Sequence, residues 1–297
     1  MPNYQSWLGE LNNDTRLSSL SIPGTHNSFA CHTALPSVQC QGESVTDQLR
    51  QGVRFLDVRV GKHPLKSGDE ANELTVVHGK FPVKIPFPLK LSDALDEVYD
   101  FVRDNNSETV IVSLKQEGTG EWNNDQDEFG KLIWDKYIGP NENKWYLGSE
   151  LPNIGSARGK VILFRRFGVR DDRGGNYGFD AASWKYNTTE DDRGRFCVQD
   201  FCEIQSADDI PKKVEYVKNL ARKASDYNST STDNKLFVNF TSGSNFFDTA
   251  CWPQQVAKAM AANNLQDSFS RGNGIIVLDY VEEDNWRMTR ELVDKNF

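Results

Sequence analysis

The sequence has no apolar run that approaches the roughly 18 to 20 residues of a membrane-spanning helix, so any contact with lipid is expected to be peripheral. It also has no excess of basic residues: 34 Lys and Arg stand against 43 Asp and Glu, and the formal net charge is -9. Nucleic-acid binding is driven by clustered Lys and Arg, so we expect no nucleic-acid partner. The 37% of apolar residues is typical of a soluble globular protein.

The N-terminus lacks the basic stretch followed by an apolar stretch that marks a signal peptide. We therefore expect either an intracellular protein or the processed form of a secreted one. Glycosylation sequons occur along the chain, but an Asn-, Ser- and Thr-rich sequence contains several by chance, so they do not decide between the two compartments.

Cysteine is scarce, with five residues in the chain. Cys31 and Cys40 form one close pair and Cys197 and Cys202 another, and each pair is spaced to close a short disulfide. Cys251 is left over, either as a small buried thiol or as a reactive one. Neither pair has the doubled C-x-x-C spacing of a zinc site.

Internal repeats, low-complexity segments and Pro/Gly/Ser-rich linkers are also absent, which predicts a single domain over residues 1–297. What recurs is a short apolar run, then a polar residue, then a loop or an amphipathic stretch. The runs predict strands at LSSLSIPGTH, VRFLDVRV, LTVVHG, TVIVSLKQE, KVILFRRF, RFCVQD, KLFVNF and GIIVLDYVE.

Amphipathic stretches between these runs predict helices over residues 92–105, 125–138, 209–225 and 253–264. Ser92 and Asp209 are suited to N-cap positions, and Pro211 and Pro253 to the first turn. Strands that alternate with helices favour a parallel sheet, and eight strands favour closure. We predict the α/β class with a TIM-type (β/α) barrel, irregular because helices after the early strands are unclear.

Nearly every predicted strand ends in a polar or ionisable residue, where barrels of this type carry their active sites. These strand-end residues are His26, Asp57 with Arg59, His78, Lys115, Arg165 or Arg166, Asp200, Ser242 and Asp279. In VRFLDVRV the side chains alternate, so Asp57 and Arg59 face the barrel interior while Leu56 and Val58 face the helices. The pair is either a structural ion pair or a functional one, and the cost of burying both charges favours function.

Two of the four histidines, His26 and His78, end predicted strands next to glycine-containing turns. Taken alone, each is more readily a structural histidine than a functional one. As a pair at one barrel mouth with Arg59, they suggest a general base and a general acid on either side of a phosphoryl group. Asp279 ends the last strand beside the first, where it would hold the His26 imidazole or act only as a cap.

The order of SIPGTHNS, GVRFLDVRV and VVHG, continued by SLKQE, GKVILFRRF, VQDF, VNFTS and VLDY, resembles the phosphatidylinositol-specific phospholipase C superfamily through its X domain. The segment CHTALPSVQCQ is similar to fungal phospholipase C-like phosphodiesterases. The resemblance implies a distorted TIM barrel in which the inositol 2-hydroxyl attacks its own phosphodiester. It implies the base role for His26 with Asp279, the acid role for His78, and charge stabilisation by Arg59.

The resemblance also implies that Lys115, Arg166 and Asp200 contact the inositol ring, with Arg166 preferred to Arg165 because it precedes Phe167. Cations at Arg59 and Lys115 match the metal-independent branch, so we expect no metal and no other cofactor. Asn27 stands where that branch has aspartate, and Cys202 where it has a ring-stacking tyrosine. The change at Asn27 alters the expected contacts to the general acid, and the change at Cys202 alters those to the inositol headgroup.

The loop SGSNFFDTACWPQQ brings Phe246, Phe247 and Trp252 near the predicted barrel mouth. The rings are expected either to anchor a monomer to the surface of a phosphoinositide-containing membrane or only to pack the loop. Two other functions remain open: another phosphodiesterase on the same barrel, for glycerophosphodiesters or sphingolipid headgroups, and a lipid-headgroup-binding module with little activity.

Overall fold

The computed structural model describes residues 1–297, which form a 12-stranded sheet. The strands are β1 (Ser21–Thr25), β2 (Phe55–Gly61), β3 (Thr75–His78), β4 (Phe81–Pro82), β5 (Val110–Gln116), β6 (Trp145–Tyr146), β7 (Val161–Arg166), β8 (Phe179–Asp180), β9 (Thr188–Asp192), β10 (Phe196–Asp200), β11 (Leu236–Phe240) and β12 (Gly274–Leu278). All eight predicted runs contain a strand.

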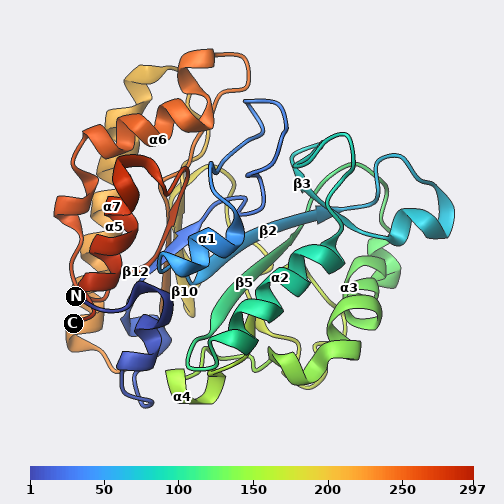
Figure 1. Ribbon diagram of the computed structural model, residues 1–297, viewed down its shortest axis with the longest axis horizontal. Coiled ribbons are helices and arrows are strands. Elements are labelled where there is room, and N and C mark those ends of the chain that lie inside the picture. Colours follow the sequence, from blue (N-terminus) through green and yellow to red (C-terminus); the bar gives the residue numbers. More distant parts are fainter.

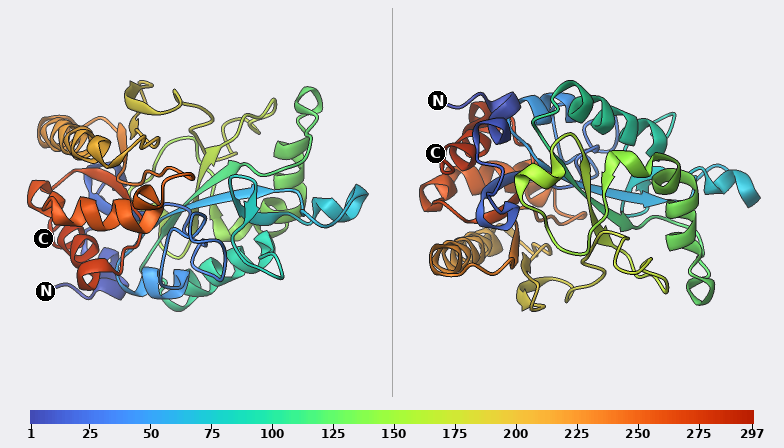
Figure 2. Two further views of the ribbon diagram at one scale, coloured as in Figure 1. Left: turned by 90° about the horizontal axis from the view of Figure 1, so that it is seen from above. Right: turned by 90° about the horizontal axis from the view of Figure 1, so that it is seen from below.

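The helices are α1 (Val45–Arg50), α2 (Leu91–Asp104), α3 (Glu128–Ile133), α4 (Ile154–Ala157), α5 (Ile210–Thr230), α6 (Pro253–Ala262) and α7 (Glu283–Asp294). α5, α6 and α7 gather at one end of the molecule and α2 and α3 at the other, and the two chain termini lie side by side (Figures 1 and 2). None of these helices combines the length and the apolar character needed to cross a membrane.

The four predicted helices all form, with differences at their starts. Pro211 and Pro253 lie in first turns as expected. Ser92 is not an N-cap, because α2 begins one residue earlier and Lys90 takes that position. Asp209 does precede α5, but its carboxylate bonds to the Gln205 amide and to Lys212 rather than capping the helix.

The sheet is a distorted TIM-type barrel with a parallel core in the order β7-β5-β2-β1-β12-β11-β10. β1 and β12 pair directly, which confirms the expected adjacency of the first and last strands. The ladder is interrupted between β8 and β9, and near this gap the Phe179 ring of β8 packs against the Phe196 ring of β10 with centroids 6.1 Å apart. Side-chain packing therefore replaces backbone bonding at this seam.

β3 corrects the expectation that all eight runs would be alternating barrel strands. It runs antiparallel to β2, with Val60 opposite Val76 and Gly61 opposite Thr75. The connection between β2 and β3 contains no covering α-helix, and a parallel crossover requires one or a comparably long segment. His78 thus reaches the barrel mouth from outside the parallel ladder.

The two faces of β2 pack into different cores, as the alternation predicted. Phe55 packs inside the barrel with Phe164, their ring centroids 5.7 Å apart. Leu56 and Val58 lie in the outer core shared with the buried face of α2. Burial of these apolar faces holds the strands in register and so fixes where each strand ends.

The five cysteines are free thiols, so neither of the two disulfides that the spacing allows is formed. Cys197 lies on β10 in a buried cluster with Leu220 of α5, whereas Cys202 lines the pocket at the barrel mouth. Cys40 is fully buried, and its Sγ contacts His78. The Sγ of Cys31 instead contacts the Phe29 carbonyl oxygen. Cys251 is a buried core thiol, in agreement with the first of its two interpretations.

Candidate functional site

A pocket of about 840 Å³ opens at the C-terminal ends of the parallel strands. Its lining includes the predicted residues His26, Arg59, His78, Lys115, Arg166, Asp200 and Asp279, together with Phe246 and Phe247 of the rim. Asp57 and Asn27 are buried beneath it. The sequence-predicted strand ends therefore converge on one cavity.

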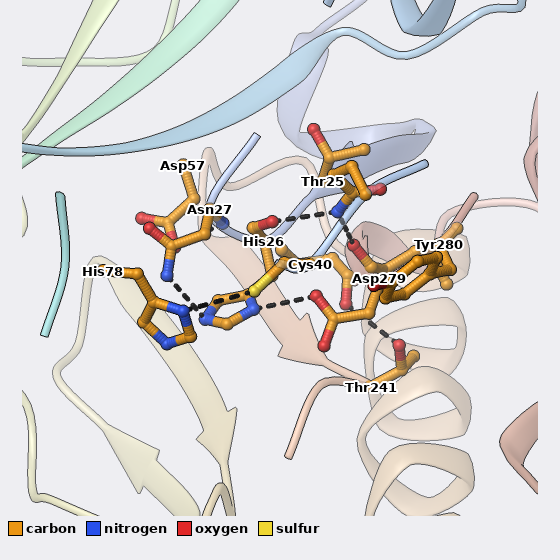
Figure 3. Close-up of polar contacts among 12 residues, drawn as sticks. Thr25, His26, Asn27, Cys40, Asp57, His78, Thr241, Asp279 and Tyr280 are labelled. Atoms are coloured by element: carbon orange, nitrogen blue, oxygen red, sulfur yellow. Dashed lines mark hydrogen bonds and ion pairs between the residues drawn. The ribbon is translucent and has the colours of Figure 1, made fainter. Parts of the chain in front are cut away.

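His26 and Asp279 form a buried pair because β1 and β12 are neighbours in register, with Thr25 opposite Leu278. His26 Nδ1 lies 2.8 Å from Asp279 Oδ1, and burial raises the pKa of Asp279 while His26 opposes that rise. Figure 3 shows His26 between Asp279 on one side and Asn27 and His78 on the other. The contact directs the Nδ1 proton to the carboxylate and leaves Nε2 as the free base position.

The chain turns sharply after each member of this pair. Asn27 has a φ of 40° and Tyr280 a φ of 43°, both in the left-handed region that non-glycine residues rarely adopt. Backbone strain of this kind persists only where the surroundings hold it, and it gathers at functional sites. Asn27 Nδ2 lies 3.3 Å from His26 Nε2, so the amide that replaces the expected aspartate contacts the candidate base.

His78 lies against His26, with ring centroids 5.6 Å apart and the planes nearly perpendicular. Its Nδ1 lies 2.8 Å from the Val38 carbonyl oxygen, so the Nδ1–H group donates there and Nε2 is left for the pocket. Burial and the neighbouring charges of His26 and Arg59 lower the pKa of His78 to about 4. No carboxylate offsets these effects at hydrogen-bond distance from the ring.

Arg59 and Asp57 form the predicted ion pair on the inner face of β2. The Arg59 Nη2 and Nε atoms lie 3.0 Å and 3.1 Å from Asp57 Oδ2. Arg166 Nη1 lies 3.4 Å from the other Asp57 oxygen. Burial would raise the pKa of Asp57, but the two guanidinium groups overcome it and hold that pKa well below its usual range.

Glu117 completes this cluster and was missed from the sequence. Its carboxylate lies 2.6 Å from Lys115 Nζ and 3.3 Å from Arg59 Nη1, and it accepts a hydrogen bond from the Gly79 amide. Although burial acts in the opposite direction, Arg59 and Lys115 lower the pKa of Glu117 to about 2. Its position two residues after Lys115, on the same strand face, is the signal that would have found it.

The far wall of the pocket is aromatic, although Cys202 occupies the position expected for tyrosine. The Trp184 ring lies 3.8 Å from the Arg166 guanidinium carbon, and its Nε1–H donates to Asp200 Oδ2 at 3.0 Å. Tyr186, 76% exposed, also lines the pocket. No motif marks these two rings, because they come from the irregular segment between β8 and β9.

Arg165 and Arg166 have different surroundings, which bears on the choice between them. Arg165 donates to the Tyr177 and Phe167 carbonyl oxygens away from the pocket. Arg166 lines the pocket, so the geometry agrees with the preference for it.

Apolar side chains crowd the rim of the pocket. Phe247 is 94% exposed and Phe246 is 48% exposed, and Phe246 stacks on Phe81 with ring centroids 6.0 Å apart. Phe81 belongs to β4, and Phe87, 78% exposed, follows β4 in the chain; neither was predicted. Trp252 differs: it is partly buried and donates to the Phe246 carbonyl, which supports the packing interpretation for this residue.

Fold and pocket together define an α/β-barrel protein in which two facing histidines lie beside a cluster of paired guanidinium and carboxylate groups. Residues 14–167 match the family model described as phosphatidylinositol-specific phospholipase C, X domain. The match covers more than half of the chain, and the protein belongs to this family.

Two curated relatives are similar over nearly the whole chain. The 1-phosphatidylinositol phosphodiesterase of Staphylococcus aureus is 28% identical over 305 residues, which cover 93% of this chain and 88% of the relative. The protein of the same name from Listeria monocytogenes is 25% identical over 301 residues, which cover 94% and 82%. A solved structure of the S. aureus phospholipase C, from a study of its membrane binding, has a TM-score of 0.79 at 24% identity and covers 99% of this chain and 98% of that one.

Proposed function

We propose that the protein cleaves the phosphodiester of phosphatidylinositol-type lipids to diacylglycerol and inositol 1,2-cyclic phosphate, using two histidines as general base and general acid. The observation that carries the proposal is the His26–Asp279 contact of 2.8 Å on a ring that faces His78 at 5.6 Å. Two imidazoles so placed can remove a proton from an attacking hydroxyl and deliver one to a leaving oxygen.

In the proposed reaction His26 Nε2 takes the proton of the inositol 2-hydroxyl as its oxygen attacks the phosphorus. The bond from phosphorus to the glycerol oxygen breaks, and that oxygen takes a proton from His78. Asp279 stabilises the imidazolium that forms on His26, since Nδ1 is already bonded to its carboxylate. Asn27 donates to Nε2 in the free protein and yields that position to the hydroxyl.

Arg59 is the proposed group that stabilises charge on the phosphate oxygens during attack. Asp57 holds its guanidinium through the Nε and Nη2 atoms, and Glu117 contacts Nη1. A donor fixed in this way needs no reorganisation when the charge develops. Asp57 thus contributes by positioning Arg59.

The inositol ring is proposed to contact Lys115, Arg166 and Asp200, with the Trp184 ring beside these groups. Lys115 and Arg166 donate to ring hydroxyls and Asp200 accepts from them. Trp184 is fixed by its cation–π contact with Arg166 and its hydrogen bond to Asp200, and it supplies the aromatic ring that Cys202 lacks. The cysteine is also the feature that favours the alternative of another phosphodiester headgroup.

The proposed reaction uses no metal ion. Calcium requires six to eight oxygen ligands, with carboxylates among them. The carboxylates beneath the pocket, Asp57 and Glu117, are bonded to Arg59, Arg166 and Lys115 instead. One cluster with metal-ligating atoms within 4.8 Å exists, at His26, Cys40 and Asp279, and two of its members are already bonded to each other.

The partner is proposed to be a phosphoinositide-containing membrane, met by a monomeric single-domain protein. Phe246 and Phe247 line the pocket and are exposed, and Phe246 stacks on Phe81 of β4. Aromatic rings insert into the interfacial region of a bilayer and need no net positive charge to do so. The rim would bring the pocket to the headgroup of a lipid that remains in the membrane.

Phosphorus NMR of lipid vesicles tests this function. With phosphatidylinositol vesicles we expect inositol 1,2-cyclic phosphate to accumulate at the same rate with a chelator and with added calcium. Vesicles of phosphatidylcholine or sphingomyelin serve as the headgroup controls. Cleavage of a control lipid in place of phosphatidylinositol would support the alternative headgroup, and binding without any cleavage would support a binding module.

A further inference from the structure

Residues 38–41, which we call the clasp, run behind both histidines. The Val38 carbonyl accepts from His78 Nδ1 at 2.8 Å. The Cys40 carbonyl accepts from the Tyr280 amide at 2.8 Å, directly after Asp279. The clasp is itself fixed at the Ala30 carbonyl, which accepts from the amides of Cys40 and Gln41. One short segment therefore contacts both His78, the proposed acid, and the residue that follows Asp279, the partner of the proposed base.

The Gln41 side chain is fully buried at the centre of the clasp. Its Nε2 donates to the His26 carbonyl at 2.9 Å and to the Leu278 carbonyl at 3.0 Å. Its Oε1 lies 3.4 Å from the Val281 amide. The primary amide fits this place because one nitrogen supplies both donated hydrogen bonds, which neither a carboxylate nor a thioether can do.

The two carbonyls that Gln41 joins belong to the ends of β1 and β12. The last register pair of these strands is Thr25 with Leu278, and the His26 amide donates to the Leu278 carbonyl at 2.9 Å. Beyond this point the chain turns away on both sides, at Asn27 and Tyr280. The Gln41 amide thus bridges the two strands where their own ladder ends.

We propose that Gln41 is a positioning residue that sets the distance and orientation of His26 relative to Asp279. Without the bridge the His26 and Leu278 carbonyls lose a shared donor, and only the hydrogen bond from the His26 amide to the Leu278 carbonyl still joins the two peptides. Because His26 Nδ1 and Asp279 Oδ1 are 2.8 Å apart, a small separation breaks their hydrogen bond. Its catalytic consequence rests on the proposed function, whereas its structural consequence does not.

The test compares Gln41→Met with Gln48→Met. Gln48 is a matched control, since it is also fully buried and its Nε2 also donates to two carbonyls, of Ser28 and Glu43, at 3.0 Å and 2.9 Å. Both variants lose two buried hydrogen bonds and are expected to melt at lower temperature. Only Gln41→Met is expected to lower kcat, by roughly 100-fold with little change in KM, because it misplaces the base.

Proton NMR of the free protein provides a readout that needs no substrate. The His26 Nδ1 proton, held by a buried carboxylate, should give a downfield resonance in the wild type and in Gln48→Met, and Gln41→Met should shift or broaden it. If Gln41→Met folds poorly, a second variant, Gln41→Glu, takes its place. It keeps the size of the side chain and the acceptor atoms but loses the amide donors, so it should show the same loss of kcat and the same shifted or broadened resonance.

Two results would overturn the inference: an unchanged downfield resonance in folded Gln41→Met or Gln41→Glu, or a kcat loss in Gln48→Met as large as in Gln41→Met. If the wild type cleaves no phosphatidylinositol, the proposed function fails, and the NMR comparison still decides whether Gln41 holds the His26–Asp279 pair.

Discussion

The side of the pocket with the proposed base and the side with the proposed acid are built differently. On the base side, His26 and Asp279 follow two paired parallel strands, and a carboxylate holds the imidazole. On the acid side, His78 ends an antiparallel strand outside the parallel ladder, and the Val38 carbonyl holds it. The comparison teaches that the register of two paired strands brings the proposed base to its carboxylate, whereas the proposed acid depends on a loop carbonyl for its orientation.

The two partners also differ in charge. A carboxylate stabilises an imidazolium, whereas a carbonyl orients the ring without a full negative charge. With Arg59 close by, burial and cationic neighbours lower the pKa of His78 to about 4. His78 is therefore neutral near pH 7 in the free protein, and it gains its proton most readily when an anionic phosphodiester occupies the pocket.

Removal of the base should have the largest effect on activity. His26→Ala is expected to lower kcat by about 10³- to 10⁴-fold, since no other imidazole in the pocket is oriented by a buried carboxylate. Initial rates on phosphatidylinositol vesicles measure the loss, and circular dichroism checks the fold. A variant that keeps more than a tenth of the wild-type rate would exclude the base role.

Replacement of Arg59 should have the next largest effect on activity. In Arg59→Lys the charge remains, but an ammonium group cannot replace the fork that contacts both Asp57 and Glu117. We expect kcat to fall by about 10²- to 10³-fold. The control is Arg165→Lys, which changes a neighbouring arginine that bonds away from the pocket and should leave kcat within a few-fold. Equal losses in both variants would count against a specific role for Arg59.

The lowered pKa of His78 should also make the stability of the protein depend on pH. Because the folded-state pKa of His78 lies below the unfolded value of about 6.5, the unfolded chain takes up the proton first as pH falls. The neutral His78 ring therefore makes its full contribution to the free energy of unfolding at pH 7, and this contribution is lost as pH falls through 6.5 toward 4. Between pH 7 and pH 5 we expect a loss of about 2 kcal/mol. Urea unfolding at the two pH values measures it, and His78→Gln should remove this part of the loss; an unchanged difference would contradict the lowered pKa.

The rim should show the smallest effect. Phe247→Ser is expected to lower the rate on vesicles by a few-fold to ten-fold through weaker adsorption, with no change for a soluble inositol phosphodiester. Phe297→Ser is a control at another exposed phenylalanine, at the chain terminus. A loss with the soluble substrate would mean that Phe247 acts in the pocket and not on the membrane.

The strand ends could be predicted from the sequence because apolar runs and period-two alternation are local signals. They led to the fold class and to the residues that line the pocket, such as His26 and Arg59. The antiparallel direction of β3 could not be predicted, since a short apolar run carries no information on direction. Whether the close cysteine pairs form disulfides could not be decided from the sequence, because spacing along the chain does not fix where a thiol points.

Residues that act through irregular segments were missed for a related reason. Trp184 lies between short strands and contacts Arg166 and Asp200 from another part of the chain. Gln41 meets the ends of β1 and β12 only after the chain has folded. A single buried glutamine has no motif, because its role depends on two carbonyls that are distant from it in sequence.

The most direct test of the account separates base from acid by the leaving group. An inositol phosphodiester with p-nitrophenol as leaving group needs little protonation, since the phenolate is stable near pH 7. We predict that His78→Ala, slow on phosphatidylinositol, recovers a rate within about ten-fold of the wild type on this substrate, whereas His26→Ala remains slow on both. Equal recovery of the two variants, or of neither, would contradict the assignment of His26 as base and His78 as acid.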